Sequence, residues 1–265
     1  MDTPPSRRRT AAPPATGPGA VRARAGASAV EAARQPARIM QALAARIVAG
    51  QLPPGARVTE TAVASEFGTS HAPVREALRM LERAGLVEIA PYRGARVREQ
   101  SVREVTELYE VRAALVGLRA RWIARDARRA EFARRLAPQV DQLARLASGG
   151  DAAAYAEAAL AVNRAFTESV ANPWLRGMLE SLSMQTARYT RLAMTGRARR
   201  MASARAWAAL LAAVASGQAA RAERIARANS LETRDATVRA LQARCRSTND
   251  QSTSAPKPGP AGGRT

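Results

Sequence analysis

The segment from Ile47 to Val97 constrains the fold of this chain more than any other part of it. It reads IVAGQLPPGARVTETAVASEFGTSHAPVREALRMLERAGLVEIAPYRGARV. A first helix ends near Gly50, and the residues Pro53–Gly55 are typical of a turn. A short second helix, a longer third helix and an arginine-bearing hairpin follow in order. This order predicts a small domain that presents its third helix beside a basic hairpin.

Apolar spacing and capping residues place the helices of this segment. Ile39, Leu43 and Ile47 recur every four residues, which puts them on one face of the first helix. Thr59 is a plausible N-cap for the second helix and Ser70 for the third, because their hydroxyls can accept hydrogen bonds from unpaired backbone amides. We therefore expect three short helices before the hairpin.

The third helix is predicted to have a buried face and a polar face. Val74, Leu78 and Leu81 form its apolar stripe, which leaves Arg75 and Arg79 away from the core. Two short strands follow over residues 87–89 and 95–97, with a turn at 91–94. Together these elements predict a winged helix-turn-helix at residues 36–98. Because such a module places one helix in a DNA groove with the hairpin, or wing, beside it, the sequence predicts DNA binding.

The rest of the chain shows only helical patterns, between tails without periodicity. We expect an all-helical second domain of six or seven helices at residues 101–242, so the fold class is mainly α. Residues 1–35 and 246–265 are rich in Pro, Gly, Ser or Ala and are expected to be disordered. The basic N-terminal tail either adds nonspecific phosphate contacts or is a solvated arm with no specific role.

Composition limits the cellular setting and the classes of partner. The net charge of +20 is compatible with nucleic acid, anionic membranes or acidic small molecules, and an arginine bias can also reflect genome composition. Cys245 is the only cysteine, so no intramolecular disulfide is expected. The longest apolar run, Ala206–Ala215, is far shorter than the roughly 20 residues of a membrane span. We expect a cytoplasmic protein without a membrane partner.

The residues of these segments resemble a known family. TETAVASEFGTSHAPVREALRMLERAGLVEIAPYRGARV, at 59–97, resembles the winged helix-turn-helix of GntR-family bacterial transcription regulators through its SxxPVREALxxLExxGLVE core and RGxxV wing. ELYEVRAALVGLRAR at 107–121, NRAFTESVANPWL at 163–175 and WAALLAAVASGQAARAERIARAN at 207–229 resemble the FCD effector domain of the FadR subfamily. The resemblance covers about 40–242.

The resemblance implies how such a protein would contact DNA. Members act as homodimers whose recognition helices enter successive major grooves of a near-palindromic double-stranded operator, while the wing reaches the minor groove. Carried over to matching positions, the DNA-contacting residues here are Ser70, His71, Ala72, Arg75, Arg79, Arg93 and Gly94. An arginine on the recognition helix can bridge two acceptors of a guanine.

Three of these positions keep alternatives open. His71 and Ala72 stand where the family usually has Arg and Thr, which puts the family's usual operator sequence in doubt. His71 either contacts a base or phosphate, or is a solvated residue at the helix start. Arg75 and Arg79 each either contact DNA or form a structural ion pair with a neighbouring Glu.

The resemblance also implies a metal site that this sequence lacks. Many FCD domains bind a divalent metal through one Asp and three His, and the metal binds a carboxylate effector. The matching positions here are Ala159, Asn163, Trp207 and Asn229, which are poor metal ligands. His71, the only histidine, lies in the other domain. We therefore expect no metal and no cofactor.

A ligand without metal remains compatible with the second domain. Asn163 and Asn229 could bond a ligand, Trp207 could form a wall, and Arg112 could bind a carboxylate of a small anionic effector. Alternatively, Asn163, Asn229 and Trp207 only pack the domain, and Arg112 pairs with a neighbouring Glu. In that case the protein is a constitutive DNA-binding regulator whose helical domain only dimerises.

Two other classes of protein are less compatible with the sequence. An enzyme is disfavoured because no phosphate-binding glycine loop, nucleophile–base pair or ligand cluster is present. A sequence-indifferent architectural protein, attracted to DNA by its charge, would bind operator and random duplexes alike. The sequence therefore favours a sequence-specific transcription regulator.

Overall fold

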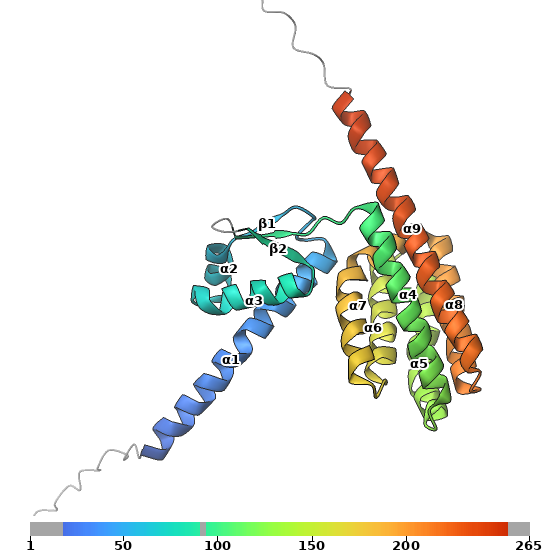
Figure 1. The fold of residues 1–265 in the computed structure, drawn as a ribbon, viewed down its shortest axis with the longest axis horizontal. Coiled ribbons are helices and arrows are strands. Elements are labelled where there is room, and N and C mark those ends of the chain that lie inside the picture. The colour runs from blue at the N-terminus through green and yellow to red at the C-terminus, as the bar shows by residue number, and fades with distance from the viewer. Residues whose placement is uncertain (1–17, 91–93, 254–265) are drawn as a thin grey trace, which may run out of the picture.

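A computed structural model describes residues 18–90 and 94–253, with side chains described over 34–90 and 94–246. Its helices and strands form two domains connected by a short extended segment (Figure 1). In chain order the elements are α1 (Pro18–Ala49), β1 (Arg57–Val58), α2 (Glu60–Phe67), α3 (His71–Arg83), β2 (Val87–Ala90), β3 (Gly94–Val97), α4 (Val102–Arg125), α5 (Arg129–Ser148), α6 (Ala152–Glu168), α7 (Pro173–Ala193), α8 (Arg197–Ala215) and α9 (Ala219–Thr253).

The first domain is a winged helix-turn-helix, as predicted. The apolar face of α1 and the stripe of α3 meet in one core, to which α2 and the strands add further side chains; its buried members include Ile39, Leu43, Ile47, Val63, Val74, Leu78, Leu81, Val87 and Val97. α2 begins at the expected N-cap, where the Thr59 hydroxyl accepts a hydrogen bond from the Ala62 amide at 3.3 Å. The apolar spacing of the sequence is therefore sufficient to define this core.

The wing contains one strand more than the sequence predicts. β2 and β3 form the expected antiparallel hairpin, and β1 pairs with the outer side of β3 to give the order β1-β3-β2. β1 has only two residues, Arg57 and Val58, which is too short for an alternating pattern to be visible in the sequence. This extra pairing anchors β3 to the segment that precedes α2.

Two helices extend beyond the domain limits expected from the sequence. α1 begins at Pro18, although residues 1–35 were expected to be disordered, and α9 continues to Thr253 through residues expected to form the C-terminal tail. Residues 18–35 are rich in alanine, which has the highest helix propensity and allows a helix to form without a periodic apolar pattern. The composition of residues 246–253 offers no such reason for the extension of α9. Apolar periodicity therefore marks the packed part of each helix, and not its end.

The second domain consists of six helices, α4–α9, around one apolar core, which confirms the mainly helical fold class. α4 packs chiefly against α9, and α5 against α8 (Figure 1). Ser101 and Glu104 form a capping box at the start of α4, and Asn172 caps α7. Over the residues that the structure describes, no helix has the length and apolar character needed to cross a bilayer.

α7 connects the two domains. Met184 packs against the core of the first domain, and the Gln185 side chain lies against Gly85. Arg188 donates hydrogen bonds to the backbone oxygen of Arg98 at 2.7 Å and to Oε1 of Gln100 at 3.4 Å, both in the connecting segment. The position of the first domain thus depends on a helix of the second.

Candidate nucleic-acid interface and buried pocket

The start of α3 presents the polar face predicted from the sequence. Ser70 occupies the N-cap position with an extended backbone, and its hydroxyl makes no capping hydrogen bond within the helix. His71 and Ala72 are exposed in the first turn, and Arg75 and Arg79 follow on the same exposed side. The small side chain of Ala72 leaves room for a close approach to a phosphate backbone.

Acidic neighbours lie beside these basic side chains. Oε2 of Glu60, on α2, lies 3.6 Å from Nδ1 of His71 and 3.8 Å from Nε of Arg75. Arg79 lies 3.8 Å from Glu76, which forms a closer contact of 2.7 Å with Arg83. The ion pair weighed as an alternative for Arg75 is therefore present.

These ion pairs leave the arginines available to a second partner. The side chains of Arg75 and Arg79 are 56% and 66% exposed. Exposed ion pairs contribute about 0–1 kcal/mol, which is less than the roughly 1–3 kcal/mol of discrimination from a good base contact. A DNA acceptor can therefore displace Glu60 from Arg75.

The wing contributes further basic side chains near α3. Arg96 on β3 is exposed and lies opposite Arg57 of β1 and Glu88 of β2. Gly94 begins β3. Arg93, which the family resemblance matches to a wing contact, lies outside the described residues. The described part of the wing thus presents a mixed basic edge.

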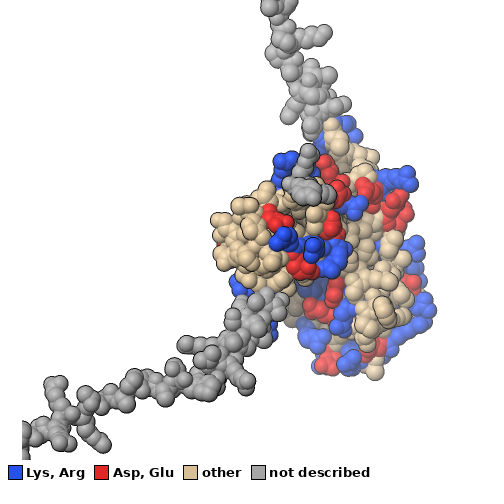
Figure 2. All heavy atoms as spheres, turned by 60° about the vertical axis from the view of Figure 1, so that its left-hand side comes forward, with Lys and Arg blue, Asp and Glu red and all other residues tan. Residues whose placement is uncertain are grey.

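Charge is mixed on one face of the molecule. Figure 2 shows basic and acidic side chains side by side on the face it displays, including the region of the first domain.

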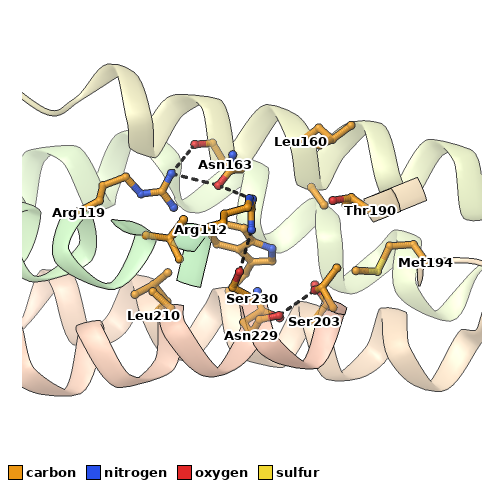
Figure 3. A pocket seen from close by; sticks show the side chains of 15 residues that line it. Arg112, Arg119, Leu160, Asn163, Thr190, Met194, Ser203, Leu210, Asn229 and Ser230 are labelled. Carbon is orange, nitrogen blue, oxygen red and sulfur yellow. Dashed lines mark hydrogen bonds between the residues drawn. The ribbon is translucent and has the colours of Figure 1, made fainter. Parts of the chain in front are cut away.

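A small pocket lies inside the helical domain. It encloses about 40 Å³ between α4, α6, α7, α8 and α9 (Figure 3). The five positions singled out from the sequence all line it, namely Arg112, Ala159, Asn163, Trp207 and Asn229. The fold therefore brings residues from four separate helices to one cavity.

The side chains of this pocket do not fit a divalent metal. In the described part of the chain, no His, Cys, Asp or Glu lines the cavity, and no group of three or more such residues could hold a metal ion. Its polar atoms come from amides, hydroxyls and guanidiniums, of which the first two are weak ligands and the last repel cations. The chemistry available here is hydrogen-bond donation and positive charge.

Arg112 does not form the ion pair that the sequence left open. Glu107 contacts Arg103 and Glu110 contacts Arg234. Arg112 instead donates from Nη1 to Ser230 Oγ at 3.1 Å and from Nη2 to Asn163 Oδ1 at 3.4 Å (Figure 3).

A second arginine, Arg119, was missed by the sequence analysis. Its Nη1 donates to the backbone oxygen and Oδ1 of Asn163, both at 3.1 Å, and to Thr167 Oγ1 at 2.7 Å. Burial, together with the nearby charge of Arg112, lowers the pKa of Arg119 to about 9. One signal was available: residues seven apart share a helix face, and Arg112 and Arg119 are the charges on an otherwise apolar face of α4.

Trp207 and Asn229 have structural partners in addition to the cavity. The Trp207 ring lies 5.4 Å, centroid to centroid, from Phe166, and it is largely buried in the core. Arg199 donates to both oxygens of Asn229 and pairs with Glu232 at 2.8 Å. Trp207 thus belongs both to the core and to the pocket wall, and hydrogen bonds from Arg199 fix the orientation of the Asn229 side chain.

Asn163 connects the pocket to α7. Its Nδ2 donates to Ser183 Oγ at 3.2 Å, and its Oδ1 accepts from both pocket arginines. Ser183 lies next to Met184 and Gln185, which contact the first domain. A change at the pocket arginines can therefore reach the domain interface through one side chain.

Comparison with protein-family models places the chain among regulators. The model of the bacterial regulatory proteins of the gntR family matches residues 35–97, and the FCD domain model matches residues 107–230. The two matches correspond to the winged helix-turn-helix and to α4–α9.

Individual relatives agree with this. The chain is 32% identical over 139 residues to the probable D-xylose utilization operon transcriptional repressor of Paenarthrobacter nicotinovorans, covering 52% of this chain and 61% of the relative. It is 38% identical over 63 residues to the uncharacterized HTH-type transcriptional regulator YdhC of Bacillus subtilis, covering 24% and 28%. The chain thus matches less than two thirds of the length of these relatives.

Solved structures share the fold. A GntR protein from Rhodococcus sp. RHA1 superposes with a TM-score of 0.57 at 19% identity, over 84% of this chain and 99% of that chain. McbR/YncC from E. coli gives a TM-score of 0.57 at 20% identity, over 82% and 98%.

Proposed function

Because the chain belongs to the gntR family of bacterial regulatory proteins and carries an FCD domain, we propose that it is a dimeric, sequence-specific transcription regulator controlled by a small anionic metabolite. The metabolite binds without metal in the pocket of the helical domain. The target is a near-palindromic operator in chromosomal DNA, so the proposed site of action is the cytoplasm.

The exposed face of α3 is the observation that carries the DNA-binding part of the proposal. His71, Arg75 and Arg79 lie on one side of a helix whose other side is buried in the core, and the wing lies next to it. In a dimer, two such helices would enter successive major grooves. Arg75 and Arg79 would contact base edges, while Ser70, His71 and Gly94 would position the backbone.

The regulatory part of the proposal rests on the contacts of α7. A ligand that binds the pocket more tightly in one arrangement of the helices shifts the population toward that arrangement. Because α7 borders the pocket at Thr190 and holds the connecting segment through Arg188, such a shift would alter the spacing of the two DNA-binding domains. Repression or activation would then depend on the arrangement that matches the operator.

A second candidate function is a constitutive regulator whose helical domain only dimerises. The size of the cavity favours it, because about 40 Å³ is far below the roughly 300–1,000 Å³ of typical small-molecule pockets. Under this alternative, no small anion changes the affinity for DNA.

Fluorescence anisotropy with the DNA upstream of the protein's own gene and with a scrambled duplex, across a salt series, tests the main proposal. We expect the upstream DNA to bind about 10³-fold or more tightly at physiological salt. Equal affinities and equal salt slopes for several upstream duplexes would instead support an architectural, charge-driven protein. Repeating the titration with candidate anions separates the regulated from the constitutive regulator.

A further inference from the structure

The pocket of the helical domain contains two positive charges and no negative one. The guanidiniums of Arg112 and Arg119 both line the cavity, and Figure 3 shows them extending from α4 toward Asn163. Arg119 is 1% exposed and Arg112 is 9% exposed. Among the described residues that line the cavity, none is Asp or Glu. Since a buried charge without a counter-charge is unfavourable, this arrangement calls for an anionic partner.

Neutral groups satisfy the two guanidiniums only in part. Arg119 forms all its hydrogen bonds through Nη1, and Arg112 forms its bonds through Nη1 and Nη2. Within the described structure, Nε of each arginine is buried and has no hydrogen-bond partner. Every acceptor that is present is an amide, carbonyl or hydroxyl oxygen, and these bind a guanidinium more weakly than a charged oxygen does.

The charge of Arg112 also disfavours the charge of Arg119. Burial is the main cause that lowers the pKa of both groups, and the charge of Arg112 lowers that of Arg119 further. An anion between the guanidiniums would relieve the repulsion and replace the solvation that burial removes.

We propose that Arg112 and Arg119 bind a compact dianion, such as inorganic phosphate, sulfate or a short dicarboxylate, in the pocket that they line. The dianion neutralises the two guanidiniums, and Ser230, whose oxygen accepts from Arg112, has a hydroxyl proton to donate. The inference rests on the proposed function, in that this pocket is its effector site.

The volume of the cavity limits the ligand. The cavity volume of about 40 Å³ suits a compact oxyanion group better than a long acyl chain or a nucleotide. Trp207, Leu210 and Met194 close the cavity with apolar surface, which suits at most a short carbon skeleton.

Occupation of the site would alter the contacts of Asn163. Oδ1 of this residue accepts from both arginines, and a dianion would compete for the same donors. Asn163 would then change its bond to Ser183 on α7. The dianion would thus act on the helix that contacts the first domain.

Thermal unfolding of the full-length protein, titrated with inorganic phosphate at constant ionic strength, tests the proposal. We expect a saturable rise in Tm for the wild type, because a ligand that binds only the native state stabilises it. Arg119→Met should weaken phosphate binding at least about tenfold, as expected for losing charge-assisted hydrogen bonds. The control Arg103→Met, at an exposed ion pair of the same helix, should titrate like the wild type.

The variants without added phosphate provide a second readout. Because Arg119→Met removes a buried charge that has no counter-charge, its Tm without phosphate should equal or exceed that of the wild type. If this variant does not fold, Arg119→Lys keeps the charge but loses the planar fork, and it should still bind phosphate more weakly than the wild type. An Arg119→Lys variant with wild-type phosphate affinity would count against the proposal.

Two further outcomes overturn the proposal. One is the absence of any saturable response of the wild type to phosphate, sulfate and malonate; the other is the same response in Arg119→Met, as general salt stabilisation would give. Failure here, with specific DNA binding intact, leaves the regulator function standing. If the protein binds phosphate saturably but does not distinguish its upstream DNA from scrambled DNA, the proposal for the pocket stands and only the proposed regulator function is refuted.

Discussion

Gly94 lies so close to Val58 that no side chain fits at position 94. A Cβ atom there would be 2.9 Å from the carbonyl oxygen of Val58, and Gly94 has a φ of +75°, a value that other residues rarely adopt. The contact joins the start of β3 to β1, at the end of the wing next to the hairpin turn. The glycine of the RGxxV wing pattern therefore has a structural reason, apart from any approach to DNA.

Gly94→Ala should destabilise the first domain by about 2 kcal/mol or more. Left-handed backbone costs a non-glycine residue roughly 1–2 kcal/mol, and the contact with the Val58 oxygen adds to it. Gly50→Ala is a matched control, because Gly50 has a φ of +79° but a Cβ atom at this position would meet no other atom within 4 Å. Chemical denaturation should give the smaller loss for Gly50→Ala, and equal losses would show that the contact with Val58 is irrelevant.

Arg75→Ala should weaken specific DNA binding by about 1–3 kcal/mol, the range of one lost base contact. Arg83→Ala is the control, since Arg83 is exposed on the last turn of the same helix and pairs with Glu76. Anisotropy with the operator and with scrambled DNA measures the difference. If Arg75→Ala binds the operator as tightly as the wild type, the Arg75 side chain makes no base contact and serves only in its ion pair with Glu60.

The sequence predicted the core of the first domain better than the contacts of the pocket in the helical domain. Apolar residues at regular spacing place the core of α1 and α3, because burial is what creates that spacing. β1 was missed because two residues carry no period. Arg119 was missed because a charge on an apolar face is expected to lie at its margin, whereas its partners Asn163 and Thr167 come from α6, 44 and 48 residues away.

Chelation should leave the folding and DNA binding of this protein unchanged. The four positions that the family resemblance matches to metal ligands hold Ala159, Asn163, Trp207 and Asn229, whose side chains are poor ligands for a divalent ion. Differential scanning fluorimetry with and without EDTA, after dialysis, measures this. A fall in Tm on chelation, restored by added zinc, would contradict the metal-free interpretation.

The capping box at the start of α4 should make stability depend on pH in the acid range. Hydrogen bonds from the backbone and side chain of Ser101 lower the pKa of Glu104 below its ordinary value of 4.5. Because the folded pKa is lowered, the contribution is fully present above pH 4.5 and is lost as the pH falls through the folded value. The difference in Tm between the wild type and Glu104→Gln should therefore shrink as the pH falls through the folded pKa of Glu104. A difference in Tm that stays constant with pH would show that ionisation of Glu104 does not contribute to stability.

Arg188→Met should separate ligand binding from the DNA response. Arg188 lies on α7, outside the pocket lining, and holds the connecting segment through Arg98 and Gln100. Its loss leaves the two pocket arginines in place, so phosphate should still raise the Tm of the variant saturably. The effect of phosphate on operator affinity should fall, because the domain interface no longer follows the position of α7. Arg197→Met, at an exposed position at the start of α8, is the control and should retain the coupling. If phosphate changes the operator affinity of Arg188→Met as much as that of the wild type, the contacts of Arg188 do not transmit the effect of the ligand to the first domain.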